Sequence, residues 1–307
     1  MPKMTISRSI TIDASKEKVF SFINDFNQWV QWSPWLLMEP EANVIVADDA
    51  KSYEWKGNRV GEGNMKILEE KENEFIRCEL NFLKPWKSFA KTAFNIEEAK
   101  DGTEVTWTMD SSLPFFMFWM KKSMQAYVGA DYERGLDMLK VLIEKGSIPS
   151  KLSFDGISSF EGCKWVGIRT KSSLDIVATQ MQADFAMLGA FTEENKDLVA
   201  GSPFTTYHKW DILKGNVDYT ASIPVKEIPD SLPDQFVSGI IPSLIAYKLK
   251  HTGSYSHLGN AWSTGYAMMR NKEFKYKKGI DTFEIYLNNP QETNEKNLET
   301  VLHFPVR

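Results

Sequence analysis

The sequence has few cysteines, and their spacing excludes two common ways of stabilising a small domain. Only Cys78 and Cys163 occur among 307 residues, and neither stands in a CxxC spacing. Structural zinc sites and disulfide frameworks both need more cysteines at closer spacing. The sequence therefore predicts no metal site, and the scarcity of cysteine favours a reducing compartment.

Long apolar runs are also missing. The N-terminus lacks the apolar segment of a secretory signal. The longest apolar run, 113–120, stops at Lys121 and Lys122, whereas a membrane-spanning helix needs about 20 such residues. We expect a cytoplasmic protein with no membrane partner.

An excess of positive charge is absent, as are the common catalytic fingerprints. Lys and Arg total 36 against 41 Asp and Glu, which gives a formal net charge of −5. Such a chain has no long-range attraction for a phosphate backbone, and neither terminus shows a helix-turn-helix with a basic recognition helix. No P-loop, GxGxxG, HExxH or nucleophile elbow occurs either. We therefore expect no cofactor and no direct contact with nucleic acid.

Aromatic residues, by contrast, are abundant. They make up 13% of the chain and include ten tryptophans, most of which precede residue 120. Aromatic side chains dominate both protein cores and apolar ligand pockets, so two interpretations stay open for the first half. If the half holds a cavity, its candidate lining residues are Trp55, Trp107, Phe115 and Trp119.

The first half has the pattern of an antiparallel sheet followed by one long helix. A strand over 7–14 precedes two short helices, and five short strands between 52 and 111 are separated by Gly, Asn and Asp. Residues 115–145 contain almost no helix breakers, and Gly146 with Pro149 forms a helix stop. The class is α+β, with a curved antiparallel sheet that grips the long helix.

This half resembles the START-like helix-grip superfamily, also called SRPBCC, in its polyketide-cyclase-like branch. The likeness is carried by the opening SRSITIDASKEKVFSFINDFNQWVQWSPW and the later GEGNMKI, and it covers residues 1–147. The resemblance implies a ligand cavity between the sheet and the long helix. Its members include lipid carriers, hormone receptors, cyclases and chaperone activators, so the activity stays open.

The second half, 155–307, follows an expected linker at 148–154 and contains an internal repeat. Strand, helix, strand, strand occurs twice, and the last strands end alike in SIPV at 222–225 and HFPV at 303–306. YHKW at 207–210 takes the place of FEIY at 283–286. Two βαββ units of this kind can cover each other around a pseudo-two-fold axis, with an antiparallel sheet between them.

This half is similar to the GyrI-like small-molecule-binding domain, the effector-binding module of AraC-type and MerR-type bacterial regulators. The blocks that carry the likeness are HTGSYSHLGNAW at 251–262, FEIYLNNP at 283–290 and the terminal LETVLHFPV. The resemblance implies that Glu284, on the penultimate strand, faces a central groove and recognises ligands that are often cationic and aromatic. Some family members hydrolyse strained electrophilic rings with the same Glu as general acid and base.

Alternation along the strand supports a functional Glu284 independently. Glu284 and Tyr286 share one face of the FEIYL segment, while apolar neighbours share the other. The alternative is an exposed sheet face. Applied to the repeat, the alternation makes His208 the counterpart of Glu284 and Trp210 the counterpart of Tyr286, although an ordinary surface histidine is the alternative for His208. The predicted groove is lined by Glu284, Tyr286, His208, Trp210, Tyr255 and Trp262.

We therefore expect two tandem ligand-binding domains that bind or sequester a small apolar or cationic aromatic molecule. A carboxylate among aromatic rings suits an organic cation through Coulomb attraction and cation–π contacts. One alternative is a hydrolase or cyclase in which Glu284 is the catalytic acid and base, because burial raises the pKa of a glutamate. The other is an adaptor that senses a ligand and contributes to transcription regulation through a partner.

Overall fold

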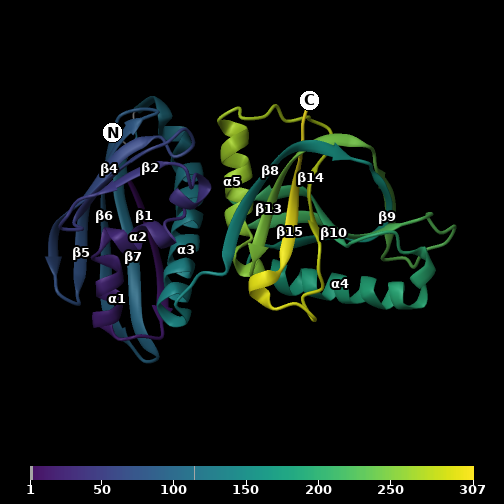
Figure 1. Ribbon diagram of the computed structural model, residues 1–307, viewed down its shortest axis with the longest axis horizontal. Helices are drawn as coiled ribbons and strands as arrows, with labels where there is room; N and C mark the ends of the chain where they lie inside the picture. Colours follow the sequence, from purple (N-terminus) through teal and green to yellow (C-terminus); the bar gives the residue numbers. More distant parts are fainter. Residues whose placement is uncertain (1–2, 114) are drawn as a thin grey trace. The chain divides into compact units, whose positions relative to one another are not determined.

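The computed structural model describes residues 3–113 and 115–307, apart from the side chains of residues 115–117. The chain divides into two compact units, of which one ends at Ile148 and the other begins at Pro149 (Figure 1). No helix within the described ranges combines the length and the apolar character needed to cross a bilayer.

The first unit is a seven-stranded antiparallel sheet with the strand order β1-β7-β6-β5-β4-β3-β2. A long helix, α3, follows the last strand and makes its most extensive strand contact with β1. The elements are β1 (Lys3–Ile12), α1 (Lys16–Ile23), α2 (Phe26–Trp32), η1 (Leu36–Met38), β2 (Asn43–Val46), β3 (Ser52–Lys56), β4 (Glu62–Lys71), β5 (Phe75–Lys84), β6 (Ser88–Ala99), β7 (Gly102–Ser112), η2 (Phe115–Met120) and α3 (Lys121–Lys145). This is the expected helix-grip arrangement, with the predicted long helix divided into a short 3-10 turn and α3.

Local chemistry explains where these helices begin and end. The Ser15 hydroxyl accepts a hydrogen bond from the Lys18 amide at the start of α1, which satisfies one of the free N–H groups of the first turn. Gly146 ends α3 in the left-handed region at φ 78°, where a side chain would be strained. Between these ends α3 buries Leu136, Leu139 and Ile143 against the sheet.

The second unit is an eight-stranded antiparallel sheet with the strand order β12-β9-β11-β10-β14-β15-β13-β8. The elements are β8 (Ser150–Phe160), β9 (Cys163–Ser173), α4 (Val177–Glu194), η3 (Lys196–Leu198), β10 (Phe204–Asp211), β11 (Asn216–Val225), β12 (Val237–Ile241), β13 (Leu244–Gly253), η4 (Tyr255–His257), α5 (Gly259–Arg270), β14 (Thr282–Tyr286), η5 (Glu295–Asn297) and β15 (Glu299–Pro305). Helix α4 packs on β9 and β11, and α5 packs on β13 and β15.

The strand order is symmetrical about the central pair β10 and β14. Corresponding strands follow in the same order from either edge of the sheet: β8 corresponds to β12, β13 to β9, β15 to β11 and β14 to β10. Each repeat is therefore strand, strand, helix, strand, strand, one strand longer than the predicted βαββ unit. The extra strands are exchanged: β8 pairs with β13 of the second repeat, and β12 pairs with β9 of the first.

The exchange also corrects the expected linker. Residues 150–154 of the predicted linker are the first part of β8, where Leu152 pairs with His251 and Ser153 pairs with Lys250. The segment carries a short strand pattern that the linker prediction overlooked, because Leu152 and Phe154 alternate with polar residues and pack against a buried cluster. Its strand conformation depends on pairing with β13, nearly a hundred residues further along the chain.

Candidate functional site

Glu284 lies at the centre of the second sheet. Its position on β14 places it directly opposite Thr205 of β10 on one side and Leu302 of β15 on the other. The side chain is only 1% exposed. Glu284 therefore does not lie on an exposed face of the sheet, which was the alternative that the sequence left open.

Three neutral donors hold the Glu284 carboxylate. The Tyr207 and Tyr286 hydroxyls donate to Oε1 at 2.7 and 2.6 Å, and the Trp262 indole N–H donates to Oε2 at 2.6 Å. No ion pair in the described part of the chain includes Glu284. The ionised carboxylate therefore keeps its full negative charge inside the protein.

Burial governs the titration of this cluster. It raises the pKa of Glu284, and the hydrogen bonds from Tyr286, Tyr207 and Trp262 offset only part of that rise. Burial together with the neighbouring carboxylate also holds the pKa of Tyr207 and of Tyr286 well above the usual range. Both tyrosines therefore stay protonated and act as donors, while Glu284 binds a proton more readily than an exposed glutamate.

The register of the two repeats shows which residues are counterparts. Phe204 pairs with Ser222 in the first repeat, and Phe283 pairs with His303 in the second, where Ser222 and His303 begin the SIPV and HFPV endings. FTTY at 204–207 is therefore the counterpart of FEIY. Thr205 corresponds to Glu284 and Tyr207 to Tyr286, so the predicted correspondence of YHKW with FEIY is out of register by three residues.

His208 accordingly does not join the Glu284 cluster. Its ring hydrogen-bonds to Asp281 through Nδ1 and to Thr220 through Nε2, both at 2.7 Å. The pairing of β10 with β11 shifts between Tyr207 and Lys209, which makes His208 the extra residue of a β-bulge. Because Thr205 lies opposite Glu284, alternation already puts Tyr207 rather than His208 on the Glu284 face, and the bulge changes the alternation only beyond Tyr207.

The same bulge brings Tyr207 and Trp210 together, three residues apart on one strand. Their rings meet edge to face at 5.7 Å, and Trp210 is half exposed. Trp210 thus borders the cluster through Tyr207, a residue that the sequence prediction did not include.

Aromatic rings form the walls around Glu284. Trp262 of α5 packs edge-on to Tyr207 at 5.1 Å, and Tyr255 of η4 packs on Tyr286 at 5.6 Å. Burial and the Glu284 charge raise the pKa of Tyr255 to about 12. The structure thus brings Tyr255, Trp262 and Tyr286 together around Glu284. A ligand that reached the carboxylate would meet these ring faces.

The tryptophans predicted to line a cavity in the first unit have different environments. Trp107 stacks between Tyr132 at 3.7 Å and Phe94 at 5.0 Å, and its indole donates to Thr92 at 2.8 Å. Trp55 is also buried, and its indole donates to the Val60 carbonyl at 3.1 Å. Both side chains belong to the hydrophobic core between the sheet and α3.

Trp119 and Phe115 lie in η2, and Trp119 is not part of that core. Trp119 is 68% exposed, so its side chain does not line an internal cavity in this structure. The side chain of Phe115 lies outside the described residues.

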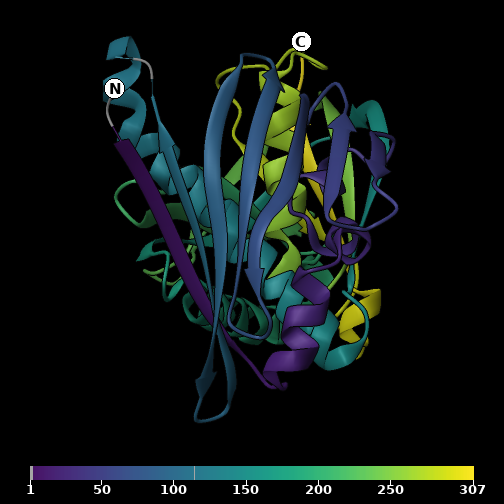
Figure 2. The same ribbon diagram turned by 90° about the vertical axis from the view of Figure 1, so that its left-hand side faces the viewer.

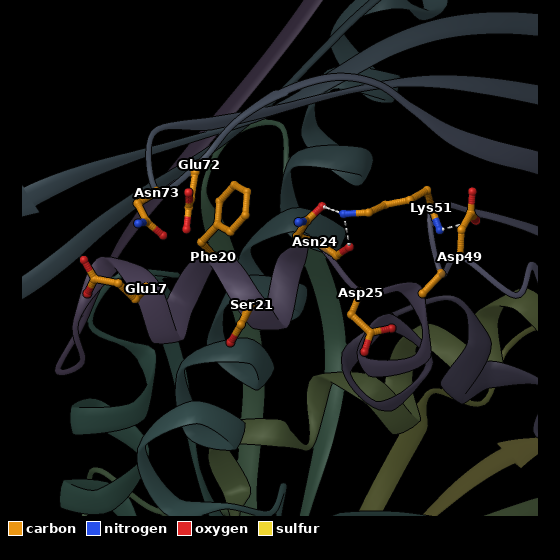
Figure 3. Close-up of a pocket in the computed structure, with 10 residues that line it drawn as sticks. Glu17, Phe20, Ser21, Asn24, Asp25, Asp49, Lys51, Glu72 and Asn73 are labelled. Carbon is orange, nitrogen blue, oxygen red and sulfur yellow. Dashed lines mark hydrogen bonds between the residues drawn. The ribbon is translucent and has the colours of Figure 1, made fainter.

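A shallow hollow of about 430 Å³ lies beside α1 of the first unit (Figure 3). Its walls include Phe20 and several carboxylates, and the Lys51 ammonium at its edge already binds Asn24 and Glu70. None of the tryptophans predicted for a cavity lines it. The described residues also contain no group of three or more His, Cys, Asp or Glu that could hold a metal ion.

The family comparisons agree with this division of the chain. Residues 3–144 match the family described as polyketide cyclase / dehydrase and lipid transport, and residues 171–307 match the GyrI-like small molecule binding domain. The chain joins a polyketide cyclase-like domain to a GyrI-like domain. The helix-grip fold of the first domain and the duplicated sheet of the GyrI-like domain confirm the α+β class expected from the sequence. No curated protein matches the sequence.

Solved structures resemble between about half and three fifths of the chain. EcmrR in a complex with DNA is 15% identical with a TM-score of 0.44, over 61% of this chain and 65% of its own. SAV2435 bound to tetraphenylphosphonium is 14% identical with a TM-score of 0.38, over 50% and 94%. The Aha1 dimer from Colwellia psychrerythraea is 18% identical with a TM-score of 0.35, over 47% and 98%. This chain thus spans just under two thirds of the EcmrR chain.

Proposed function

We propose that the GyrI-like domain binds a small organic cation with an aromatic body at Glu284. The observation that carries the proposal is a buried carboxylate whose partners are all neutral and whose walls are aromatic rings. A cation that enters such a site is attracted by an unscreened negative charge and by the ring faces. A neutral ligand of the same shape gains only the apolar contacts.

Binding at this site is coupled to a proton. Since burial raises the pKa of Glu284, the empty site retains a proton to a higher pH than an exposed glutamate does. A cation stabilises the ionised carboxylate and lowers that pKa, so its binding releases a proton. The affinity for a cation therefore increases with pH until Glu284 is fully ionised without the ligand.

Access to the site requires a side chain to move. Glu284 is almost fully enclosed, whereas Tyr255 and Trp262 are only partly buried. The Trp262 indole holds Oε2 with a single hydrogen bond, so its displacement frees one carboxylate oxygen and opens the space that the ring occupies. The ligand then takes the place of the Trp262 ring beside the Glu284 carboxylate.

The test compares tetraphenylphosphonium with the neutral triphenylphosphine oxide on the full chain. Thermal-shift and calorimetric titrations should show saturable binding of the cation, which raises the melting temperature by mass action. Glu284→Gln, which keeps the shape and removes the charge, should abolish the cation shift. Glu193→Gln, at a surface ion pair with Lys196, is the matched control and should bind as the wild type does. Equal binding of the cation by Glu284→Gln contradicts the proposal.

The raised pKa also supports a second candidate function, in which Glu284 moves a proton in a hydrolysis or cyclisation. A carboxyl whose pKa is raised by burial can act as a general acid near neutral pH. Mass spectrometry of each bound compound after incubation separates the two functions. A binding protein returns the compound unchanged, whereas an enzyme yields a product with the wild type and none with Glu284→Gln.

A further inference from the structure

Large aromatic side chains are exposed at one end of the first domain. Trp86, in the turn between β5 and β6, is 55% exposed, and Trp119 of η2 is 68% exposed. Three more apolar residues nearby in the sequence are also exposed: Leu83, Phe89 and Phe118. Contiguous exposed apolar patches are uncommon on a protein surface and mark interaction sites, whereas single exposed apolar residues are ordinary.

The two segments leave the same end of the sheet. Ala90 at the start of β6 pairs with Ser111 at the end of β7, and the Ser111 hydroxyl donates to the Phe89 carbonyl at 3.0 Å. The β5–β6 turn precedes this point, and η2 follows it within a few residues. Figure 2 shows the turn and η2 at the upper end of the first sheet.

Both segments are positively charged in a chain that is acidic overall. Residues 81–95 contain Lys84, Lys87 and Lys91, and residues 111–130 contain Lys121 and Lys122, while neither stretch contains Asp or Glu. Glu62 of β4 pairs with Lys84 at 2.8 Å and is the one acidic neighbour that an ion pair in the described residues brings to the turn. Lys91 lies between Glu79 and Asp110 in the sheet, so the charge beside the tryptophans comes from Lys87, next to Trp86, and from Lys121 and Lys122, just after Trp119.

We propose that this end of the first domain docks on the surface of an anionic lipid bilayer. Tryptophan prefers the boundary between headgroups and acyl chains, and lysines beside it interact with the headgroup phosphates. Each lysine near such a surface contributes roughly fivefold in affinity. A second copy of this chain is a poorer partner, because its matching surface carries the same positive charge.

The proposal departs from the sequence-based expectation of no membrane partner, which rested on the lack of a spanning segment. Docking at an interface needs only a few inserted aromatic rings and a basic rim, and no spanning helix. It is also independent of Glu284, because the residues involved belong to the other domain.

Co-sedimentation of the full chain with vesicles provides the test. We expect binding to vesicles of phosphatidylcholine mixed with phosphatidylglycerol, weak binding to phosphatidylcholine alone, and weaker binding at high salt. Trp86→Ser combined with Trp119→Ser should reduce the affinity at least about tenfold. Lys87→Ala combined with Lys122→Ala should reduce it about 5- to 30-fold. Trp210→Ser, at a half-exposed tryptophan of the second domain, is the matched control and should change nothing.

Three outcomes would overturn the proposal. They are the absence of binding to the anionic vesicles, binding that the paired tryptophan substitutions leave unchanged, and a wild-type oligomer that those substitutions convert to a monomer. The last result would assign the surface to a second copy of the chain.

Circular dichroism and thermal unfolding of each variant establish that lost binding does not reflect lost folding. Both tryptophans are exposed, so their replacement should change the free energy of unfolding by no more than about 0.5 kcal/mol.

Discussion

Thr205 and Glu284 face each other across the two central strands of the second domain, and they are counterparts in its two repeats. The pseudo-two-fold axis therefore passes between a hydroxyl and a carboxylate. The counterpart tyrosines, Tyr207 and Tyr286, converge on the same Glu284 oxygen, and the Tyr286 hydroxyl also lies 2.9 Å from the Thr205 hydroxyl. A carboxylate in both repeats would place two like charges side by side in a buried site, and one of them would have to be protonated.

Removal of either tyrosine hydroxyl should weaken the domain. Tyr207→Phe leaves a buried carboxylate with one donor fewer, which costs about 1–3 kcal/mol of unfolding free energy. Tyr286→Phe removes contacts to both Glu284 and Thr205 and should cost more. Urea denaturation measures both changes. Tyr127→Phe, at an exposed tyrosine of the first domain, should stay within about 0.5 kcal/mol. Losses no larger than in this control would show that the cluster contributes nothing to stability.

The pH dependence of stability should carry the signature of Glu284. A folded-state pKa above the unfolded value means that the folded protein retains a proton that the unfolded chain has released. Stability therefore falls as the pH rises from the unfolded pKa toward the folded one, by about 1.4 kcal/mol for each unit of pKa difference.

Glu284→Gln removes this titration, so its stability relative to the wild type should increase across that pH range. Denaturation curves at a series of pH values from 4 to 8 measure the difference. A constant gap between the two proteins at every pH contradicts a raised pKa. Glu193→Gln again provides the comparison at an exposed carboxylate.

His303 should contribute to unfolding in acid. Burial lowers its pKa to about 4, and its ring stacks on Phe283 at 4.6 Å. The unfolded chain takes up a proton near pH 6.5 while the folded protein does not, so stability is lost as the pH falls from about 6.5 to 4, on the order of 3 kcal/mol. His303→Phe keeps the stacking and removes the titration, so its loss of stability over this range should be smaller. If the wild type and His303→Phe lost the same stability as the pH falls, the titration of His303 would not be the cause of that loss.

Trp107 should act as a core residue of the first domain. Its ring is buried and stacks on both Tyr132 and Phe94, so Trp107→Ala should cost about 3–5 kcal/mol in the unfolding of that domain. Trp119→Ala, at an exposed ring, is the comparison and should stay within about 0.5 kcal/mol. Equal effects of the two substitutions would contradict the division between a buried and an exposed tryptophan.

Much of the first domain could be predicted because its signals are local. The Ser15 cap and the Gly146 stop each depend on residues within one turn of the chain. The prediction failed where the face on which a side chain lies, or the partner of a strand, depends on residues far away in the sequence. The three-residue error in aligning the repeats exchanged the roles of Tyr207 and His208, and β8 depends on β13 for its conformation.

The sequence by itself determined the α+β class, the two halves and the presence of a repeat in the second half, because alternation, caps and matching strand endings are properties of neighbouring residues. Only the tertiary structure decided that Thr205 is the counterpart of Glu284, that Tyr207 replaces His208 beside it, and that Trp107 is buried while Trp119 is exposed. Each of these depends on which strands pair and in which register. Register is set by contacts between residues far apart in the chain, and a shift of one residue moves every side chain to the other face of the sheet.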